Sequence, residues 1–324
     1  MTSQRKFQHL TEEQVDSFMK HGFLRIPNCF SPEKAEEWTS NVWKRLGMSP
    51  TDKSTWTQER INMPSHRTES TATFAPKAWD TMCELLGGED RIAPESGVWQ
   101  DSLIVNLGSK EFEGREPDPR GLPGWHVDGD FFMHFLDSPE QGLLVIPLFT
   151  DIEPSGGGTV ICSDGMPVIA KHLYEHTEGV YPRMVPRGEK PKHEGLGFFC
   201  EIVSQCHEFH EMTGKTGDVI LMHPLMLHSA SRNSLRNLRI ITNPPVALKQ
   251  PFNFNRENPE DYSLVELKTL AMLGKDQLED WKITGTRDPV VPERIRRQAE
   301  MKQKELERLK AASLEAPRVT ALAV

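Results

Sequence analysis

Between residues 98 and 242, short apolar runs alternate with turn residues, and this pattern constrains the fold more than any other feature of the chain. Over residues 98–107 one face carries Gln100, Ser102, Ile104 and Asn106, which is the two-residue period of a β-strand. Further runs of strand length follow at residues 143–149, 159–162, 219–222 and 238–242. Several short strands with turns between them predict an all-β sandwich or barrel.

Helix signals flank this β-rich region on both sides. A capping box of Thr11 and Gln14 begins the first predicted helix, and Gly22 ends it. A second capping box at Ser263 begins a helix that stops at Gly274. Helices are expected at about residues 12–21, 32–46, 76–86, 264–273 and 292–312. Residues 50–75 are polar and are expected to form a loop.

The chain divides by composition into two parts. Residues 1–250 are expected to form the β-rich domain together with its N-terminal helices, and residues 251–324 a helical C-terminal extension. The extension is expected either to pack on the core or to form the contact of a homodimer. At 324 residues, the chain is long enough to bury a sizeable core.

The composition excludes several classes of protein. A formal net charge of −9 argues against a nucleic-acid partner, and no apolar run approaches the roughly 20 residues of a membrane span. The N-terminal residues lack the apolar stretch of a secretory signal, so a cytoplasmic location is expected. Five scattered cysteines, an odd number, indicate reduced thiols instead of a disulfide framework.

His126 and Asp128 are the first candidates for chemistry. On a strand, side chains two residues apart leave the same face, so this imidazole and this carboxylate can reach one point in space. An imidazole and a carboxylate are two thirds of the facial triad that holds non-haem Fe(II) with open coordination positions. The sequence therefore predicts two of the three ligands of a metal site here. The third ligand, a second histidine, must come from elsewhere in the chain.

Two later histidines compete for the third ligand position. His223 and His228 are five residues apart and do not share a strand face, so the residues alone leave both open. Arg239 follows within an apolar strand, where an unpaired guanidinium is costly. Its partner is expected to be either a bound dicarboxylate or a structural Asp or Glu.

Two other motifs have simpler interpretations. Cys206, His207 and His210, with Cys200 upstream, have residue types that zinc prefers, but the paired C-x-x-C elements of structural zinc sites do not occur. Solvated loop residues are the favoured interpretation. The glycine run at residues 155–158 precedes a β-branched stretch and lacks the Gly-Lys-Ser/Thr of a phosphate loop, so a hairpin turn is expected.

Over roughly residues 9–246, the chain resembles the phytanoyl-CoA dioxygenase family of Fe(II)/2-oxoglutarate-dependent oxygenases. The order and spacing of several motifs carry the resemblance: residues 10–18, 22–28, 30–31, 125–128, 151–159 and 217–218, with His228, Asn233 and Arg239. The resemblance implies a mainly β fold with flanking helices and a double-stranded β-helix (jelly-roll or cupin-like) core. The 102 residues from His126 to His228 suit such a core, in which the last ligand returns from a late strand.

The resemblance also assigns roles to residues. It implies that His126, Asp128 and His228 are the catalytic iron ligands, that Arg239 pairs with the distal carboxylate of 2-oxoglutarate, and that His223 is a core or outer residue. It makes three further side chains candidate 2-oxoglutarate contacts: Asn106, Ser102 and Thr159. The Gly-Ser-His usual after the glycine turn is replaced by Cys-Ser-Asp-Gly at residues 162–165.

The expected activity is that of a dioxygenase that uses Fe(II), 2-oxoglutarate and O2, and releases succinate and CO2. Related halogenases have a small residue where this chain has Asp128, so oxidation of a C–H bond is favoured. The substrate is expected to be a small lipophilic compound or a natural product of secondary metabolism. Phe131, Phe132 and Met133 are candidates for its pocket, with a core role as the alternative.

Two other functions remain open at this stage. A metal-dependent cupin-type hydrolase or isomerase would use the same three ligands to activate water, without O2 or 2-oxoglutarate. A catalytically silent binding protein on the same scaffold would need none of the ligands.

Overall fold

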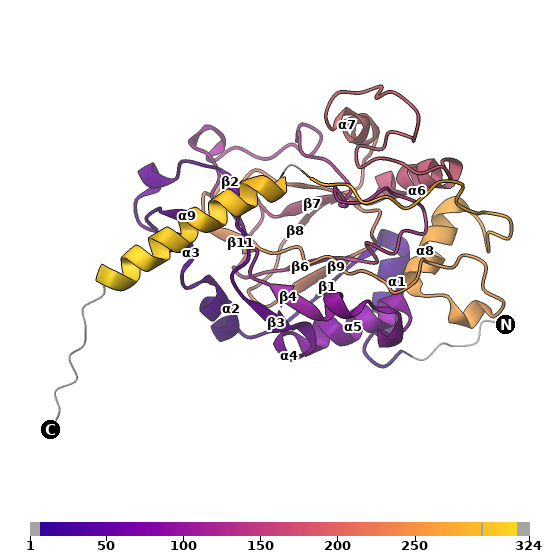
Figure 1. The fold of residues 1–324 in the computed structure, drawn as a ribbon, viewed down its shortest axis with the longest axis horizontal. Helices are drawn as coiled ribbons and strands as arrows, with labels where there is room; N and C mark the ends of the chain where they lie inside the picture. Colours follow the sequence, from indigo (N-terminus) through magenta and orange to yellow (C-terminus); the bar gives the residue numbers. More distant parts are fainter. Residues whose placement is uncertain (1–6, 293, 316–324) are drawn as a thin grey trace.

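Small antiparallel sheets form the centre of the molecule, and helices surround them (Figure 1). The structure, a computed structural model, describes residues 7–292 and 294–315. Residues 1–6, on whose composition the expected location rests, lie outside this part. In the described part the strand orders are β1-β9-β6, β10-β7-β8, β11-β5-β2 and β3-β4. The expectation of a mainly β core with flanking helices therefore agrees with the antiparallel sheets observed.

The strands are short. The first sheet contains β1 (Phe23–Ile26), β9 (Val219–Met222) and β6 (Leu144–Pro147). The second contains β10 (Leu227–Ala230), β7 (Thr159–Cys162) and β8 (Phe209–Met212). The third contains β11 (Arg239–Ile241), β5 (Ile104–Asn106) and β2 (Arg60–Asn62), and the pair is β3 (Thr68–Ser70) with β4 (Val98–Gln100).

Apolar side chains from the first two sheets pack against one another. Ile161 of β7 belongs to the same buried cluster as Leu144 of β6 and Met222 of β9. Ile241 of β11 belongs to this cluster too, and the bridge from Leu148 to Ile241 links the third sheet to the end of β6. The three sheets therefore share one interior, and burying such side chains stabilises it by about 1.5–3 kcal/mol each.

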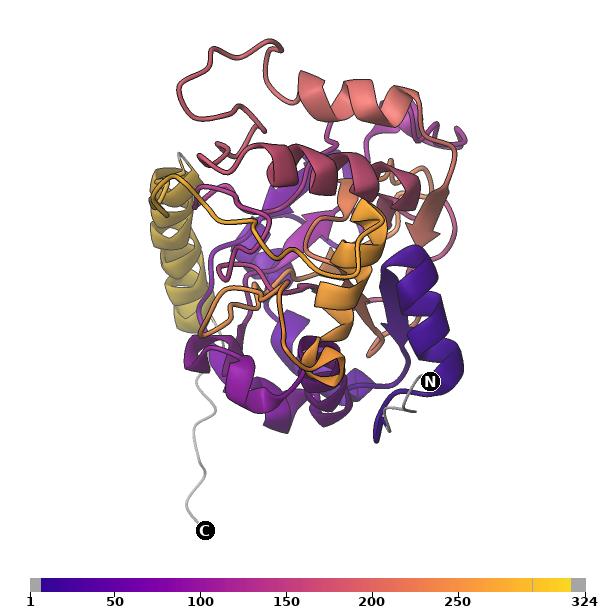
Figure 2. The same ribbon diagram turned by 90° about the vertical axis from the view of Figure 1, so that its right-hand side faces the viewer.

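Helices α1 (Glu12–His21), α5 (Pro76–Leu86) and α6 (Met166–Glu175) all contact α8 (Leu264–Leu273) (Figure 2). Both predicted capping boxes are present, at Thr11 and Ser263, and the helices they begin end at glycines in the left-handed conformation. The remaining helices are α2 (Pro32–Thr39), α3 (Val42–Leu46), α4 (Thr71–Phe74), α7 (Gly197–Ser204) and α9 (Arg294–Glu315). No helix in the described ranges is long and apolar enough to cross a bilayer.

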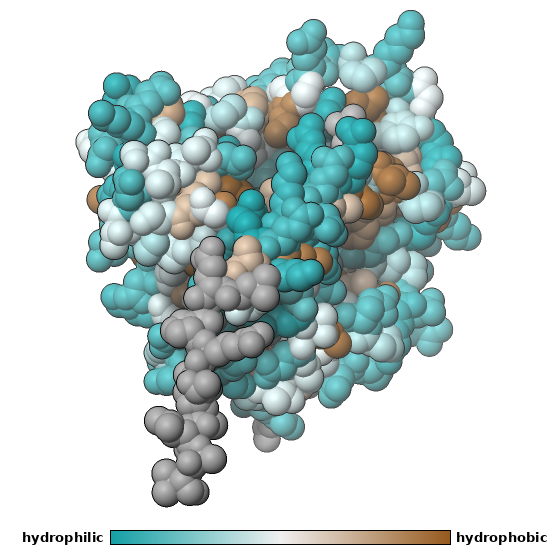
Figure 3. Space-filling view, turned by 60° about the vertical axis from the view of Figure 1, so that its left-hand side comes forward, coloured by the Kyte–Doolittle hydropathy of each residue, from teal (hydrophilic) through white to brown (hydrophobic). Residues whose placement is uncertain are grey.

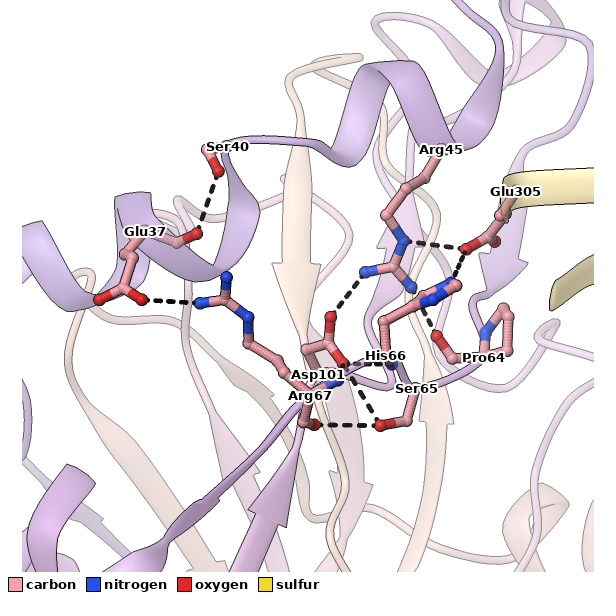
Figure 4. Close-up of polar contacts among 9 residues, drawn as sticks. All are labelled: Glu37, Ser40, Arg45, Pro64, Ser65, His66, Arg67, Asp101 and Glu305. Carbon is pink, nitrogen blue, oxygen red and sulfur yellow. Dashed lines mark hydrogen bonds and ion pairs between the residues drawn. The ribbon is translucent and has the colours of Figure 1, made fainter. Parts of the chain in front are cut away.

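The C-terminal helix α9 packs against α3, and the surface on this side is mostly hydrophilic (Figure 3). A buried polar network fastens it (Figure 4). The Arg45 guanidinium donates from Nε to Glu305 of α9 (2.9 Å), from Nη1 to Asp101 (2.9 Å), and from Nη2 to the Pro64 carbonyl (2.5 Å). Glu305 also bonds His66 Nε2 (2.9 Å). Helix α9 is therefore fastened to the segments that carry Arg45 and His66.

Four predictions about local structure are wrong. The helix expected over residues 32–46 is two helices, α2 and α3, with a break near Ser40. Residues 50–75, expected to be loop, contain β2, β3 and α4. The strand expected over residues 98–107 is divided into β4 and β5 because Asp101 turns inward to bind Arg45 and two backbone amides. His126 lies in an isolated bridge and not in a strand.

Candidate metal centre

Three side chains far apart in the sequence converge on one point: His126, Asp128 and His228. One ligand atom from each lies within 4.8 Å of the others. Asp128 Oδ1 is 3.2 Å from His126 Nε2 and 3.6 Å from His228 Nε2. The two histidines are a hydrogen-bonded antiparallel pair, with each backbone N–H donating to the other's carbonyl at 3.0 Å. This bridge places the late histidine beside the early one.

Backbone carbonyls orient both imidazoles. His126 Nδ1 donates to the Gly124 carbonyl (2.7 Å), and His228 Nδ1 donates to the Met226 carbonyl (3.0 Å). A carbonyl only accepts, so the proton of each neutral ring lies on Nδ1. The lone pair of each Nε2 is then free on the side of Asp128, which is the arrangement that metal-binding histidines require.

The electrostatics of the three residues favour a cation. Burial opposes ionisation of Asp128, but His228 and His126 outweigh it and hold the pKa of this carboxyl well below its usual range. Burial opposes protonation of His126, but the adjacent Asp128 carboxylate outweighs it and raises the pKa of this imidazole. The carboxylate is therefore ionised at neutral pH, and positive charge is favoured beside it.

Two adjoining pockets open at this centre. The inner pocket, about 530 Å³, is lined by the three residues and by Arg239 and Thr159. The outer pocket, about 790 Å³, shares His126 and Asp128 with the inner one. Its wall includes side chains from several segments and from α9: Ser102, Phe131, Arg183, Leu196, Arg294 and Lys302. A ligand beside the three residues can therefore contact both pockets.

Arg239 is a buried cation that faces the inner pocket. Its side chain donates from Nε to the Gly157 carbonyl (2.7 Å) and from Nη1 to the Ile104 carbonyl (3.4 Å). Within residues 7–292 and 294–315, no carboxylate forms an ion pair with it. Burial and, to a smaller extent, the nearby Arg60 lower the pKa of Arg239 to about 9, while Glu211 acts in the opposite direction. The group is still charged at neutral pH.

The glycine turn has a second role that the sequence did not indicate. The Gly157 carbonyl accepts hydrogen bonds from Arg239 Nε and from Asn106 Nδ2 (3.3 Å), so it positions both. Gly157 has φ +78°, and a Cβ there would lie 2.6 Å from Asn106 Nδ2. Any other residue would therefore displace the carbonyl that holds the guanidinium.

The other candidate residues occupy different places. Thr159 lines the inner pocket and Ser102 the outer one. Asn106 is fully buried, and its amide bonds three backbone groups, at Gly157, Ser231 and Gly108. Phe131 lines the outer pocket, whereas Phe132 and Met133 are buried.

His223 lies away from the centre, in the core beneath α8. Its Nδ1 accepts from the Leu225 N–H (3.1 Å), and its Nε2 donates to the Thr269 hydroxyl (2.9 Å), so both ring nitrogens have protein partners. Burial lowers the pKa of His223 to about 3. The structure thus brings His228, and not His223, to His126 and Asp128.

Sequence reasoning missed several residues that line the inner pocket, among them Glu59, Arg60, Asn62 and Asn243. Three of these come from the segment expected to be loop. The only available signal was the alternation of Arg60, Ile61 and Asn62, which is too short to distinguish a strand from a polar loop.

No protein-family model matches this sequence, and a comparison with curated proteins finds no match. Similar solved structures include a hypothetical protein JW0805 from Escherichia coli, at 13% identity and TM-score 0.46 over 82% of each chain. EctD from S. alaskensis is 18% identical, with TM-score 0.43 over 78% of this chain and 84% of that one. HygX from Streptomyces hygroscopicus, with nickel, 2-oxoglutarate and hygromycin B bound, is 13% identical, with TM-score 0.41 over 74% of this chain and 88% of that one. With all three TM-scores below 0.5, these similarities do not determine the chemistry of this chain.

Proposed function

We propose that this chain is an Fe(II)/2-oxoglutarate-dependent dioxygenase that hydroxylates or otherwise oxidises a C–H bond of a small molecule. In its simplest form, the substrate, O2 and 2-oxoglutarate give the hydroxylated substrate, succinate and CO2. One observation carries the proposal: Arg239, a buried cation without a carboxylate partner in the described chain, lines the same pocket as His126, Asp128 and His228. A double-stranded β-helix is the core that we propose for this site.

The donor set fits Fe(II). Two imidazoles and one carboxylate are the ligand combination of non-haem iron oxygenases, and they leave coordination positions open. The backbone bonds at Nδ1 present both Nε2 lone pairs toward the ionised Asp128. Bound there, Fe(II) would supply the redox chemistry that couples decarboxylation of 2-oxoglutarate to oxidation of the substrate. The protein contributes orientation, because the rings are fixed before any ion arrives.

Arg239 is the proposed anchor for 2-oxoglutarate. A planar guanidinium pairs both oxygens of a carboxylate, which fixes a dicarboxylic acid in one orientation. The pair would also neutralise a charge that burial makes costly. Thr159 lines the same pocket and is the proposed second contact. Asn106 would act indirectly, through the Gly157 carbonyl that it shares with Arg239.

The outer pocket is the proposed substrate site. It contains apolar groups, Phe131 and Leu196, together with cationic groups such as Arg183 and Lys302. A lipophilic small molecule or natural product with polar substituents would suit this lining. Ser102 lies on this side, so we propose that it contacts the substrate and not 2-oxoglutarate.

Anaerobic titration tests the proposal. Fe(II) followed by 2-oxoglutarate is expected to give a visible charge-transfer band in the wild-type protein. His228→Ala should abolish the band, whereas His223→Gln, a change in the other candidate histidine, should retain it. Absence of a band in the wild type, or its survival in His228→Ala together with its loss in His223→Gln, would contradict the proposal. Turnover without O2 and 2-oxoglutarate would instead favour a hydrolase or isomerase.

A further inference from the structure

A second group of metal-binding side chains lies where α1 meets β8. It consists of three residues: His21, the last residue of α1; Glu208, which directly precedes β8; and His210, the second residue of β8. One ligand atom from each lies within 4.8 Å of the others. Glu208 and His210 are two residues apart in extended chain, so their side chains leave the same face. His210 belongs to the cysteine–histidine motif, and the prediction of solvated loop residues is wrong for it, because His210 lies in β8.

The fold brings these residues together at the edges of two sheets. Gly22, in the left-handed conformation, ends α1 and leads directly into β1, an edge strand of the first sheet. β8 is an edge strand of the second sheet. The ring of His210 lies 5.6 Å from that of His21 and 5.4 Å from that of Phe23, measured between centroids. The group therefore spans the junction between the two sheets.

Two of the ring nitrogens lack partners. His21 Nδ1 and His210 Nε2 are buried, and neither forms a hydrogen bond with the described part of the protein. Leaving a buried polar atom unsatisfied costs about 1–3 kcal/mol. Two imidazoles with buried, unsatisfied nitrogens beside a carboxylate form a donor set for a metal ion.

The surrounding charges indicate which kind of ion fits. Glu208 Oε2 accepts from the Ser163 hydroxyl (2.8 Å), which leaves Oε1 as the ligand oxygen. The Lys268 ammonium, held by the Met19 and Lys20 carbonyls, adds positive charge near His21 and disfavours a hard cation held mainly by charge. Imidazole nitrogens instead bind borderline transition-metal ions through directed bonds. Two histidines and one glutamate are a recurrent zinc set.

We propose that His21, Glu208 and His210 bind a zinc-like divalent transition-metal ion, with water as the fourth ligand, that ties the α1–β1 junction to the edge strand β8. Its role is structural. None of the three residues lines either pocket at the candidate metal centre. His210 and His228 both pair with Ile161, from opposite sides, so β7 separates the two sites by two strand spacings, about 10 Å.

The cysteines of the original motif are not part of this site. Cys206 groups with Cys162 and Asp164 instead, and His207 contacts Arg120 through Nδ1 (3.0 Å). His207 is therefore a matched control: it is a histidine of the same segment, exposed, and outside the proposed ligand set.

Metal stoichiometry tests the inference. Chelator-treated protein should take up two Zn²⁺ per chain, one at each site, in a competition titration with a chromophoric chelator. Asp128→Ala should retain one, and in that background Zn²⁺ should still raise the melting temperature. Adding His210→Ala should abolish both the uptake and the thermal shift, whereas adding His207→Ala should leave them unchanged.

A milder variant tests the same site with less risk that the protein fails to fold. Glu208→Gln alters an exposed residue without changing its size and should weaken Zn²⁺ binding at least about tenfold in the Asp128→Ala background. Co²⁺ bound at this site should give the intense visible absorption of a tetrahedral complex. If Asp128→Ala binds no Zn²⁺, or if His207→Ala removes binding as fully as His210→Ala, the inference is wrong. Because this test uses protein without the first centre, its result does not depend on the proposed oxygenase function.

Discussion

Two arginines, Arg45 and Arg239, are equally hidden from solvent and differ in what neutralises them. Arg45 is 3% exposed and Arg239 is 2% exposed. Arg45 pairs with two carboxylates, Asp101 and Glu305, whereas Arg239 has only backbone carbonyls within the described chain. A buried charge without a partner is costly, so a protein that retains one leaves a position for a partner that binds.

Two histidines, His223 and His228, differ in the same way as the two arginines. His223 has a protein partner at each ring nitrogen, whereas His228 has one only at Nδ1 and turns Nε2 toward Asp128. In both pairs, one member is completed by the protein and stabilises the fold. The other member is incomplete and lies at the inner pocket. Polar or charged groups that lack a protein partner, more than the types of residue, therefore distinguish the candidate site from the core.

Removal of Arg45 should have the largest effect. Arg45→Met leaves Asp101 and Glu305 buried without their cation, which should lower the free energy of unfolding by about 3–5 kcal/mol. Urea denaturation measures this loss. Arg296→Met, a change at an exposed position of α9, should change stability by no more than about 0.5 kcal/mol. Equal losses in the two variants would contradict the structural role of the network.

Ligand binding should separate the two arginines next. With metal present and O2 absent, 2-oxoglutarate at about 100 times its Kd should stabilise the wild-type protein by about 2.7 kcal/mol. Arg239→Met should lose most of this stabilisation, because the distal carboxylate loses its partner. Arg45→Met should retain it in full at a temperature at which it is folded. If 2-oxoglutarate stabilises Arg239→Met as much as the wild type, the proposed difference between the two arginines is wrong.

The pH dependence of the free energy of unfolding should reveal His223, whose ring nitrogens both have protein partners. The pKa of His223 is lowered to about 3 in the folded state, so between pH 6.5 and pH 3 the unfolded chain binds a proton that the folded chain excludes. Stability from this group is thus complete above pH 6.5 and is lost as the pH falls. From pH 7 to pH 5 the loss should be about 2 kcal/mol. His223→Gln should show a correspondingly shallower pH dependence in urea denaturation; an unchanged slope would be inconsistent with the buried neutral ring.

The smallest effect should be that of Arg239 on the ligand-free protein. Arg239→Met removes a costly buried charge while Asn106 still bonds the Gly157 carbonyl, so the free energy of unfolding should change by no more than about 1 kcal/mol. Thermal or urea unfolding without ligand measures it. A loss as large as that of Arg45→Met would indicate that Arg239 is structural.

The sequence predicted those parts of the fold that local chemistry determines. Capping boxes at Thr11 and Ser263 and stop glycines at Gly22 and Gly274 gave correct helices, since caps act through neighbouring residues. The break at Asp101 could not be predicted in this way, because it depends on Arg45, 56 residues away. Strands such as β2 and β10 have too few residues to show a period, and long-range pairing determines them.

At the candidate site, too, the sequence predicted what local spacing determines and missed what long-range pairing determines. The i, i+2 relation of His126 and Asp128 was visible locally, and the two side chains do lie together, although His126 forms an isolated bridge and neither residue is in a strand. The choice between His223 and His228 was not local, since it depends on a backbone pairing across 102 residues. The role of Gly157 was invisible, because a carbonyl carries no side-chain signal.

The most direct test is whether Arg239 recognises the distal carboxylate of 2-oxoglutarate. Calorimetric titrations of the metal-loaded, anaerobic protein would compare 2-oxoglutarate with 2-oxopentanoate, which has the same five-carbon chain without the distal carboxylate. Losing one partner of a buried charge pair costs about 2–5 kcal/mol, so the wild type should prefer 2-oxoglutarate at least about 30-fold. Arg239→Met should bind the two acids with nearly equal affinity. If the variant keeps the wild-type preference, Arg239 is not the anchor and the central claim fails.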